Sequence, residues 1–204
     1  MWEVALASAR ERPGLLTAAA LATVTPDDIA ALFRIDDETV ADPERRAALW
    51  RDLAAGLERD HDGQAAELLA AAGGCLGGGG GLVALLGRYE AYSDPLRKKA
   101  FLFAKICERR GWLQVADPEG WEVSADNVLM RLALRAGLVD PGPAQTVRAG
   151  TRDAFHRVGL EAGVDLPMLD DLLWELGRRD PDLLGTAGGA ELREPDRPEG
   201  TIYY

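Results

Sequence analysis

The chain is poor in the residues from which metal sites, disulfide frameworks and histidine-based catalytic sites are built. It contains only two cysteines, Cys75 and Cys107, and two histidines, His61 and His156. The cysteines do not have the spacing of metal ligands, and so few thiols favour a reducing compartment, for which we expect the cytoplasm. The histidines are far apart and lie among charged residues, which gives little support to a metal site or a Ser-His-Asp triad. We therefore expect neither a metal nor another cofactor.

Basic residues are too few for a protein that binds nucleic acid in general. The chain has 23 Lys and Arg against 34 Asp and Glu, which gives a formal net charge of −11. A surface that binds a duplex needs basic side chains that replace the counterions of the phosphates. Long apolar runs are also missing, and the longest is far shorter than a membrane-spanning helix requires. We therefore expect no general nucleic-acid binding and no membrane partner.

A glycine-rich segment, 73–81, contains seven glycines. A phosphate-binding loop of this kind needs a strand before it and a Lys-Ser or Lys-Thr pair after it. The sequence has neither of these features, so we interpret the segment as a flexible loop.

Helical patterns occupy most of the remaining chain. The clearest helix starts are Thr25-Pro26-Asp27-Asp28, Asp42-Pro43-Glu44 and Asp165 followed by Pro167, because each combines a capping side chain with a proline in the first turn. No pair of strands is convincing, so the pattern predicts an all-α multi-helix bundle of about eight helices. We expect a single helical domain over 1–180 and a C-terminal tail, 181–204, that packs back on it.

The stretch 93–139 predicts two helices joined by a connection that contains tryptophan. The first has a candidate cap at Ser93 or Asp94, carries Pro95 at its first helical position and ends at Gly111. The second has a candidate cap at Ser124 and stops near residue 137. The two helices can pack as a hairpin.

This hairpin places Lys98, in the first turns of one helix, near Asp126, at the start of the next. The amine and the carboxylate can then meet over a shared pocket, where the acid stabilises positive charge or activates water. From the residues alone the more common roles are favoured, with Asp126 an ordinary acid that binds free N–H groups at a helix start and Lys98 a solvated surface lysine.

The last strong helix, MLDDLLWELG (168–177), presents Leu169, Leu172, Leu173 and Leu176 as its expected core face. Asp170 and Trp174 stand four residues apart and therefore share a side of this helix. A carboxylate beside an indole suits a ring ligand with donor groups, and it suits a surface tryptophan with an acidic neighbour equally well.

Seven segments form an ordered series along the chain. They are Trp2 with the helix after it, LATVTPDDIAALFR (21–34), RYEAYSDPLRKKAFLFAK (88–105), SADNVLMRLALRAG (124–137), VRAGTRDAF (147–155), MLDDLLWELG (168–177) and IYY (202–204). Taken together and in this order, they resemble the queuosine salvage protein family, whose members release the base queuine from queuosine 5'-phosphate.

The resemblance implies an all-helical fold related to the helix-hairpin-helix DNA glycosylases. It also implies hydrolysis of an N-glycosidic bond without a metal, with queuosine 5'-phosphate or queuosine as the small-molecule partner. By position, the family's catalytic aspartate falls on Asp126 and the lysine of its helix on Lys98. The family's late acid and tryptophan fall on Asp170 and Trp174.

These residue types suit the implied reaction. Cleavage builds positive charge on the ribose, which an ionised Asp126 stabilises. Lys98 would keep that acid ionised and hold a ribose hydroxyl or the 5'-phosphate. Asp170 would accept hydrogen bonds from the base, and Trp2 or Trp174 would stack on its ring. Asn127, next to the catalytic position, is a further substrate-binding candidate.

The chain departs from the family pattern in two places. Met1 stands where the family usually has a tyrosine, with a substantial aromatic-containing part before it, and Asn127 and Val128 replace a tyrosine and an arginine. Three interpretations remain open: a start placed too late, a partner polypeptide that supplies the missing part, or a reduced relative that binds a nucleobase or a partner protein. A DNA base glycosylase is a further alternative, although Gly120-Trp121 is a poor match for the glycine hairpin that it needs.

Overall fold

The computed structural model describes residues 7–8, 10–12, 14–34, 36, 38–196 and 201. Within these ranges the chain forms α-helices and short 3₁₀ turns and no strand, which confirms the all-α multi-helix prediction. The elements are α2 (Ala18–Leu21), α3 (Pro26–Leu32), α4 (Pro43–His61), α5 (Ala65–Ala71), α6 (Leu82–Leu86), η1 (Glu90–Tyr92), α7 (Lys98–Arg109), η2 (Pro118–Gly120), α8 (Asn127–Arg135), α9 (Ala144–Ala162) and α10 (Leu166–Arg179). No helix in the described part of the chain is long and apolar enough to cross a membrane.

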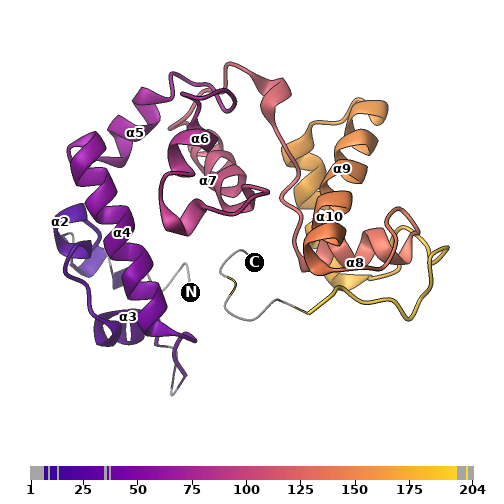
Figure 1. Cartoon of the computed structure of the whole chain (residues 1–204), viewed down its shortest axis with the longest axis horizontal. Helices are drawn as coiled ribbons and strands as arrows, with labels where there is room; N and C mark the ends of the chain where they lie inside the picture. Colours follow the sequence, from indigo (N-terminus) through magenta and orange to yellow (C-terminus); the bar gives the residue numbers. More distant parts are fainter. Residues whose placement is uncertain are drawn as a thin grey trace.

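The helices follow one another around an open arc (Figure 1). The short helices α2 and α3 pack on the long helix α4 at one end, and α8, α9 and α10 pack together at the other, with α6 and α7 between them. The main hydrophobic core joins side chains from α5 through α10. A smaller core around Ile29 and Ala47 holds α3 against α4. The relation to helix-hairpin-helix glycosylases stays a prediction.

Local sequence sets the helix starts that were clearest from the pattern. Thr25 Oγ1 accepts the N–H of Asp28 at 3.1 Å, and the Asp28 carboxylate accepts the N–H of Thr25 at 2.9 Å, which is a complete capping box. The side chains of Asp42 and Asp165 likewise cap α4 and α10. These three predicted starts are therefore confirmed.

The two central helices begin later than their sequence predicts. Helix α7 starts at Lys98 and not at Pro95, because the Asp94 carboxylate binds the N–H groups of Leu96 and Lys98 across a turn in which Arg97 has a left-handed φ of 56°. Helix α8 starts at Asn127, and its cap is Asp126 rather than Ser124. Both helix starts are set by a buried aspartate: Asp94 binds N–H groups in the turn before α7, and Asp126 binds N–H groups in the first turn of α8.

The glycine-rich segment connects α5 to α6 and is anchored at its first turn. The Asp117 carboxylate accepts the N–H of Leu76 at 2.7 Å and of Gly77 at 2.9 Å. Against the effect of burial, these two hydrogen bonds lower the pKa of Asp117. The start of the loop thus binds the Asp117 carboxylate through its backbone, and the flexibility of the segment stays a prediction.

The segment after α10 lies along α8. The Arg135 side chain donates to the carbonyl of Leu192 at 3.0 Å, and the N–H of Gly188 donates to the carbonyl of Arg135 at 2.8 Å. Residues 197–200 and 202–204 of the predicted tail lie outside the described residues. The division into a domain ending at residue 180 and a tail stays a prediction.

Replacing Gly56 with alanine should destabilise the fold. A Cβ at this position of α4 would lie 2.3 Å from Cε1 of Tyr89, whose side chain is buried. Overpacking of this kind costs about 1–3 kcal/mol, more than the gain of at most about 1 kcal/mol that alanine brings to a helix. Urea unfolding of Gly56→Ala should therefore show a lower midpoint than the wild type. A higher midpoint, as helix propensity alone predicts, would contradict the close contact between α4 and Tyr89.

Candidate functional site

Asp126 caps α8 and is buried. Its Oδ1 atom accepts the N–H groups of Val128 at 2.9 Å and Leu129 at 3.0 Å, and the residue is only 8% exposed. The helix-capping interpretation of Asp126 is therefore correct, and it fixes the carboxylate at the positive end of the helix dipole. Both hydrogen bonds go to Oδ1, so among the described residues Oδ2 is left without a donor. A capping role thus leaves one oxygen of a buried carboxylate for another partner.

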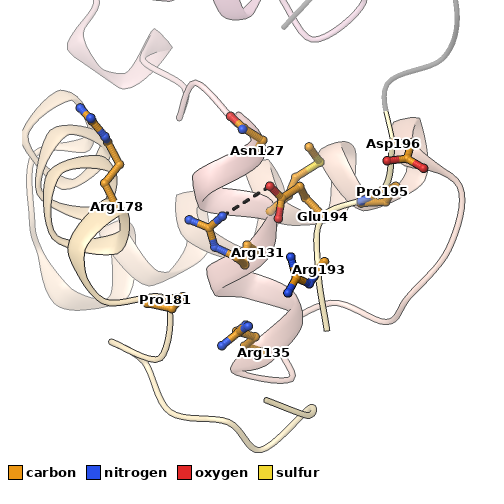
Figure 2. A pocket seen from close by; sticks show the side chains of 10 residues that line it. Asn127, Arg131, Arg135, Arg178, Pro181, Arg193, Glu194, Pro195 and Asp196 are labelled. Atoms are coloured by element: carbon orange, nitrogen blue, oxygen red, sulfur yellow. Dashed lines mark hydrogen bonds and ion pairs between the residues drawn. The ribbon is translucent and has the colours of Figure 1, made fainter. Parts of the chain in front are cut away.

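Asn127, the next residue, is exposed and lines a cavity of about 570 Å³ on the side of α8 (Figure 2). Asp126 is not among the residues that line this cavity. The two neighbouring positions therefore face different surroundings, and the substrate-binding role of Asn127 stays a prediction.

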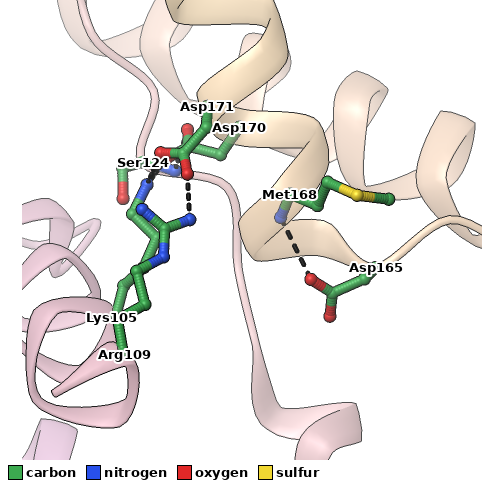
Figure 3. A network of polar contacts seen from close by, with 7 residues as sticks. All are labelled: Lys105, Arg109, Ser124, Asp165, Met168, Asp170 and Asp171. Atoms are coloured by element: carbon green, nitrogen blue, oxygen red, sulfur yellow. Dashed lines mark hydrogen bonds and ion pairs between the residues drawn. The ribbon is translucent and has the colours of Figure 1, made fainter.

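Asp170, on α10, is a second buried carboxylate close to Asp126. Its Oδ2 atom lies 2.5 Å from Nζ of Lys105, and its Oδ1 atom accepts the N–H of Ser124 at 3.1 Å (Figure 3). Burial raises the pKa of Asp170 against the opposing effect of Lys105, and the negative charge of Asp126 adds to the rise. Asp170 thus holds the backbone two residues before Asp126 and is electrostatically coupled to it.

The amine of Lys105 joins α7 to α10 through two carboxylates. Besides Asp170, it contacts Oδ1 of Asp171 at 2.7 Å, and Arg109 on the next turn of α7 also pairs with Asp171. Burial acts against ionisation of Asp171, but the hydrogen bonds from Lys105 and Arg109 outweigh it and lower its pKa. Lys105 itself is only 5% exposed, and the two carboxylates compensate its charge inside the protein.

Lys105 was not among the lysines expected at this site. The predicted residue, Lys98, is the first residue of α7 and is half-buried. Lys105 lies two turns further along α7, seven residues away and therefore on nearly the same side. A lysine among the apolar residues of an amphipathic helix was the available signal. The pairing of Lys98 with Asp126 stays a prediction.

Helix α10 is rotated relative to the core face expected from its leucines. Asp170, Leu173 and Gly177 are buried, whereas Leu172 and Leu176 are 49% and 41% exposed. The predicted core face is therefore wrong for these two leucines. The cause is Gly177, whose missing side chain lets Leu132 of α8 approach so closely that a Cβ would lie 2.5 Å from its Cδ1 atom.

The two tryptophan candidates differ in what the structure says of them. Trp174 is 43% exposed, and the guanidinium of Arg178 lies 4.6 Å from the centre of its ring. Its exposed indole remains a candidate stacking surface, although Asp170, one turn earlier, is buried. Trp2 lies outside the described residues.

A buried ion pair fixes the segment that leads into Asp126. The guanidinium of Arg148, on α9, binds both oxygens of Asp94 at 3.1 and 2.7 Å, and both side chains are fully buried. Nε of Arg148 also lies 3.5 Å from the carbonyl of Ala125. The Asp94–Arg148 pair thus links the turn before α7 to α9, and Arg148 also contacts the residue immediately before Asp126.

The arrangement brings together the buried aspartates Asp126 and Asp170 and a lysine that compensates the charge of Asp170. Within the described ranges, no group of three or more His, Cys, Asp or Glu could hold a metal. Chemically, it provides an acid with one oxygen fixed by the backbone and a second acid that holds the adjacent chain.

Neither a protein-family model nor a curated protein matches the chain.

Proposed function

We propose that this protein hydrolyses the N-glycosidic bond of queuosine 5'-phosphate or queuosine and releases queuine. The observation that carries the proposal is the buried Asp126 carboxylate, held at the start of α8 through Oδ1 alone. It occupies the position where the resemblance of the ordered segments to the queuosine salvage family places the catalytic acid.

The reaction adds water to the anomeric carbon of the ribose and breaks its bond to the base. Positive charge develops on the sugar as the base leaves with the bonding electron pair, and a neighbouring carboxylate lowers the energy of that state. The two backbone N–H groups keep Oδ1 of Asp126 in place, while Oδ2 is the oxygen we assign to the sugar or to the attacking water. The departing base takes up the proton that water provides.

Asp170 serves this reaction in two ways. Through Ser124 it positions the chain beside Asp126, and its carboxylate retains lone pairs that can accept hydrogen bonds from the base. Trp174 supplies an exposed ring for stacking. We assign the reaction to the cytoplasm, since both cysteines are free thiols.

The test is an assay of base release. Purified protein is incubated with queuosine 5'-phosphate, and separately with queuosine, and free queuine is measured by mass spectrometry. Release of queuine from either compound supports the proposal. Binding of queuine without turnover of either compound would replace it with the reduced, ligand-binding interpretation. Release of a base from duplex DNA, with salt-sensitive binding, would replace it with a DNA glycosylase.

Replacing Lys98 with methionine should weaken substrate binding. If Lys98 holds a ribose hydroxyl or the 5'-phosphate, its loss should raise KM for queuosine 5'-phosphate by about tenfold, the loss of one hydrogen bond to a charged group. The matched control is Lys99→Met, which removes a half-buried lysine from the adjacent position of α7. Equal KM values for the two variants would remove Lys98 from the site.

A further inference from the structure

A cavity between α8 and the chain that follows α10 is lined by basic side chains (Figure 2). Its volume is about 570 Å³, within the range of sites that hold small molecules. Four arginines and two acids line it: Arg131, Arg135, Arg178, Arg193, Glu194 and Asp196. Arg135 is already paired with Asp182 at 2.5 Å, so the other three arginines exceed the two acids of the lining by one positive charge, in a chain whose net charge is −11.

Arg131, at the centre of this cavity, is incompletely hydrogen-bonded. Its Nε atom is buried and has no hydrogen-bond partner among the described residues. Its two terminal nitrogens make only long contacts, 3.4 Å to Oε1 of Glu194 and 3.5 Å to the carbonyl of Gly177. A guanidinium has five N–H donors in a planar fork, so most of its capacity to bind an oxyanion is left over.

Glu194 occupies the position where an anion would bind Arg131. It belongs to the segment after α10, and both side chains of the pair are about one quarter exposed. The carboxylate makes a single long contact in place of the two parallel hydrogen bonds that arginine prefers. It is therefore a weak internal occupant that a better acceptor can displace.

We infer that this cavity binds a phosphate-bearing anion, which displaces Glu194 from Arg131. A phosphate offers several acceptor oxygens and matches the guanidinium fork better than one carboxylate oxygen does. The exposed Arg193, on the same segment as Glu194, provides a second guanidinium at the cavity. Asp126 does not line the cavity but Asn127, the predicted substrate-binding residue next to it, does, so the inference concerns anion binding and does not depend on the proposed hydrolysis.

The test compares the affinity for inorganic pyrophosphate among single variants, measured by calorimetry at low salt. Glu194→Gln should bind severalfold more tightly than the wild type, because it removes the internal competitor. Glu119→Gln makes the same charge change at an exposed residue outside the cavity and should leave the affinity unchanged. Equal affinities for these two variants would overturn the inference, since only the net charge would then matter.

Loss of the arginines should act in the opposite direction. Arg131→Gln should weaken pyrophosphate binding by about tenfold. Because Arg131 is partly buried, Arg193→Gln provides a second variant at an exposed residue, with an expected loss of severalfold. Unchanged binding in both variants would overturn the inference.

The source of the phosphate is decided by two further titrations, with orthophosphate and with guanosine 5'-monophosphate. Tighter binding of the nucleotide than of both inorganic anions supports an organic phosphate as the ligand. Tighter binding of pyrophosphate supports a free inorganic anion. Failure of all three anions to bind the wild type would overturn the inference.

Discussion

Asp126→Asn should slow the release of queuine from queuosine 5'-phosphate by about 10²–10⁴-fold, the usual contribution of a positioned acid or base. Asparagine keeps the side-chain oxygen that accepts the N–H groups of Val128 and Leu129, and it is as good a helix cap as aspartate. The variant therefore loses the negative charge and retains the start of α8. Single-turnover mass spectrometry of released queuine measures the effect.

The matched control is Asp165→Asn. Asp165 caps α10 through the N–H of Met168 at 3.1 Å and is exposed, so the same chemical change is made at a helix cap away from the site. Its rate of base release should equal that of the wild type. Full activity in Asp126→Asn, or equal losses in both variants, would remove Asp126 from catalysis.

Arg148→Met should lower the free energy of unfolding by about 3–5 kcal/mol, which is the usual result of removing one partner from a buried ion pair. Asp94 would be left fully buried without the guanidinium that binds both of its oxygens. For a chain of 204 residues the corresponding fall in Tm is roughly 6–20 °C. Differential scanning calorimetry and urea unfolding both measure it.

The control for this variant is Arg45→Met. Arg45 forms an ion pair with Glu90 at 2.5 Å, but the two side chains are 42% and 45% exposed, so the loss should be below about 1 kcal/mol. Asp94→Asn combined with Arg148→Met should recover part of the stability, because no unpaired charge then remains inside. Equal losses in the buried and exposed variants would contradict the burial of the Asp94–Arg148 pair.

The effect of Arg148→Met should also depend on pH. Burial alone would raise the pKa of Asp94, but the hydrogen bonds from Arg148, Leu96 and Lys98 outweigh it and hold the pKa below its ordinary value. Such a carboxylate contributes stability above the unfolded pKa of about 3.9, and this contribution is lost as the pH falls through the lower, folded value. In the variant, burial raises the pKa of Asp94 above that ordinary value, so the difference between the variant and the wild type should begin to shrink already above about pH 4 and continue to shrink as the pH falls through the lowered wild-type value.

Local sequence was sufficient where a helix start depends on neighbouring residues. The capping box of Thr25 and Asp28 involves residues three apart, and the sequence shows both partners. The start of α7 depends instead on Asp94, whose partner Arg148 is 54 residues away. The sequence gives no sign of that pairing, so it predicts a start at Pro95 that the structure does not have.

The site was predictable to a similar extent. The sequence marked Asp126 and Asp170 as acids worth testing, and both are buried. It did not reveal Lys105, because the ion pair with Asp170 joins residues 65 apart. It also misplaced the core face of α10, since leucines lie on several sides of that helix and only the close approach of Leu132 to Gly177 selects one.

The bond between Asp170 and the N–H of Ser124 links the geometry of the acid on α8 to helix packing elsewhere. Asp170 forms an ion pair with Lys105 of α7, and it also accepts the N–H of Ser124, in the chain that leads to Asp126 (Figure 3). A shift of α7 against α10 is therefore transmitted through two polar contacts to the peptide groups just ahead of the acid. We therefore expect a substitution of Lys105 on α7 to change the position of the Asp126 carboxylate.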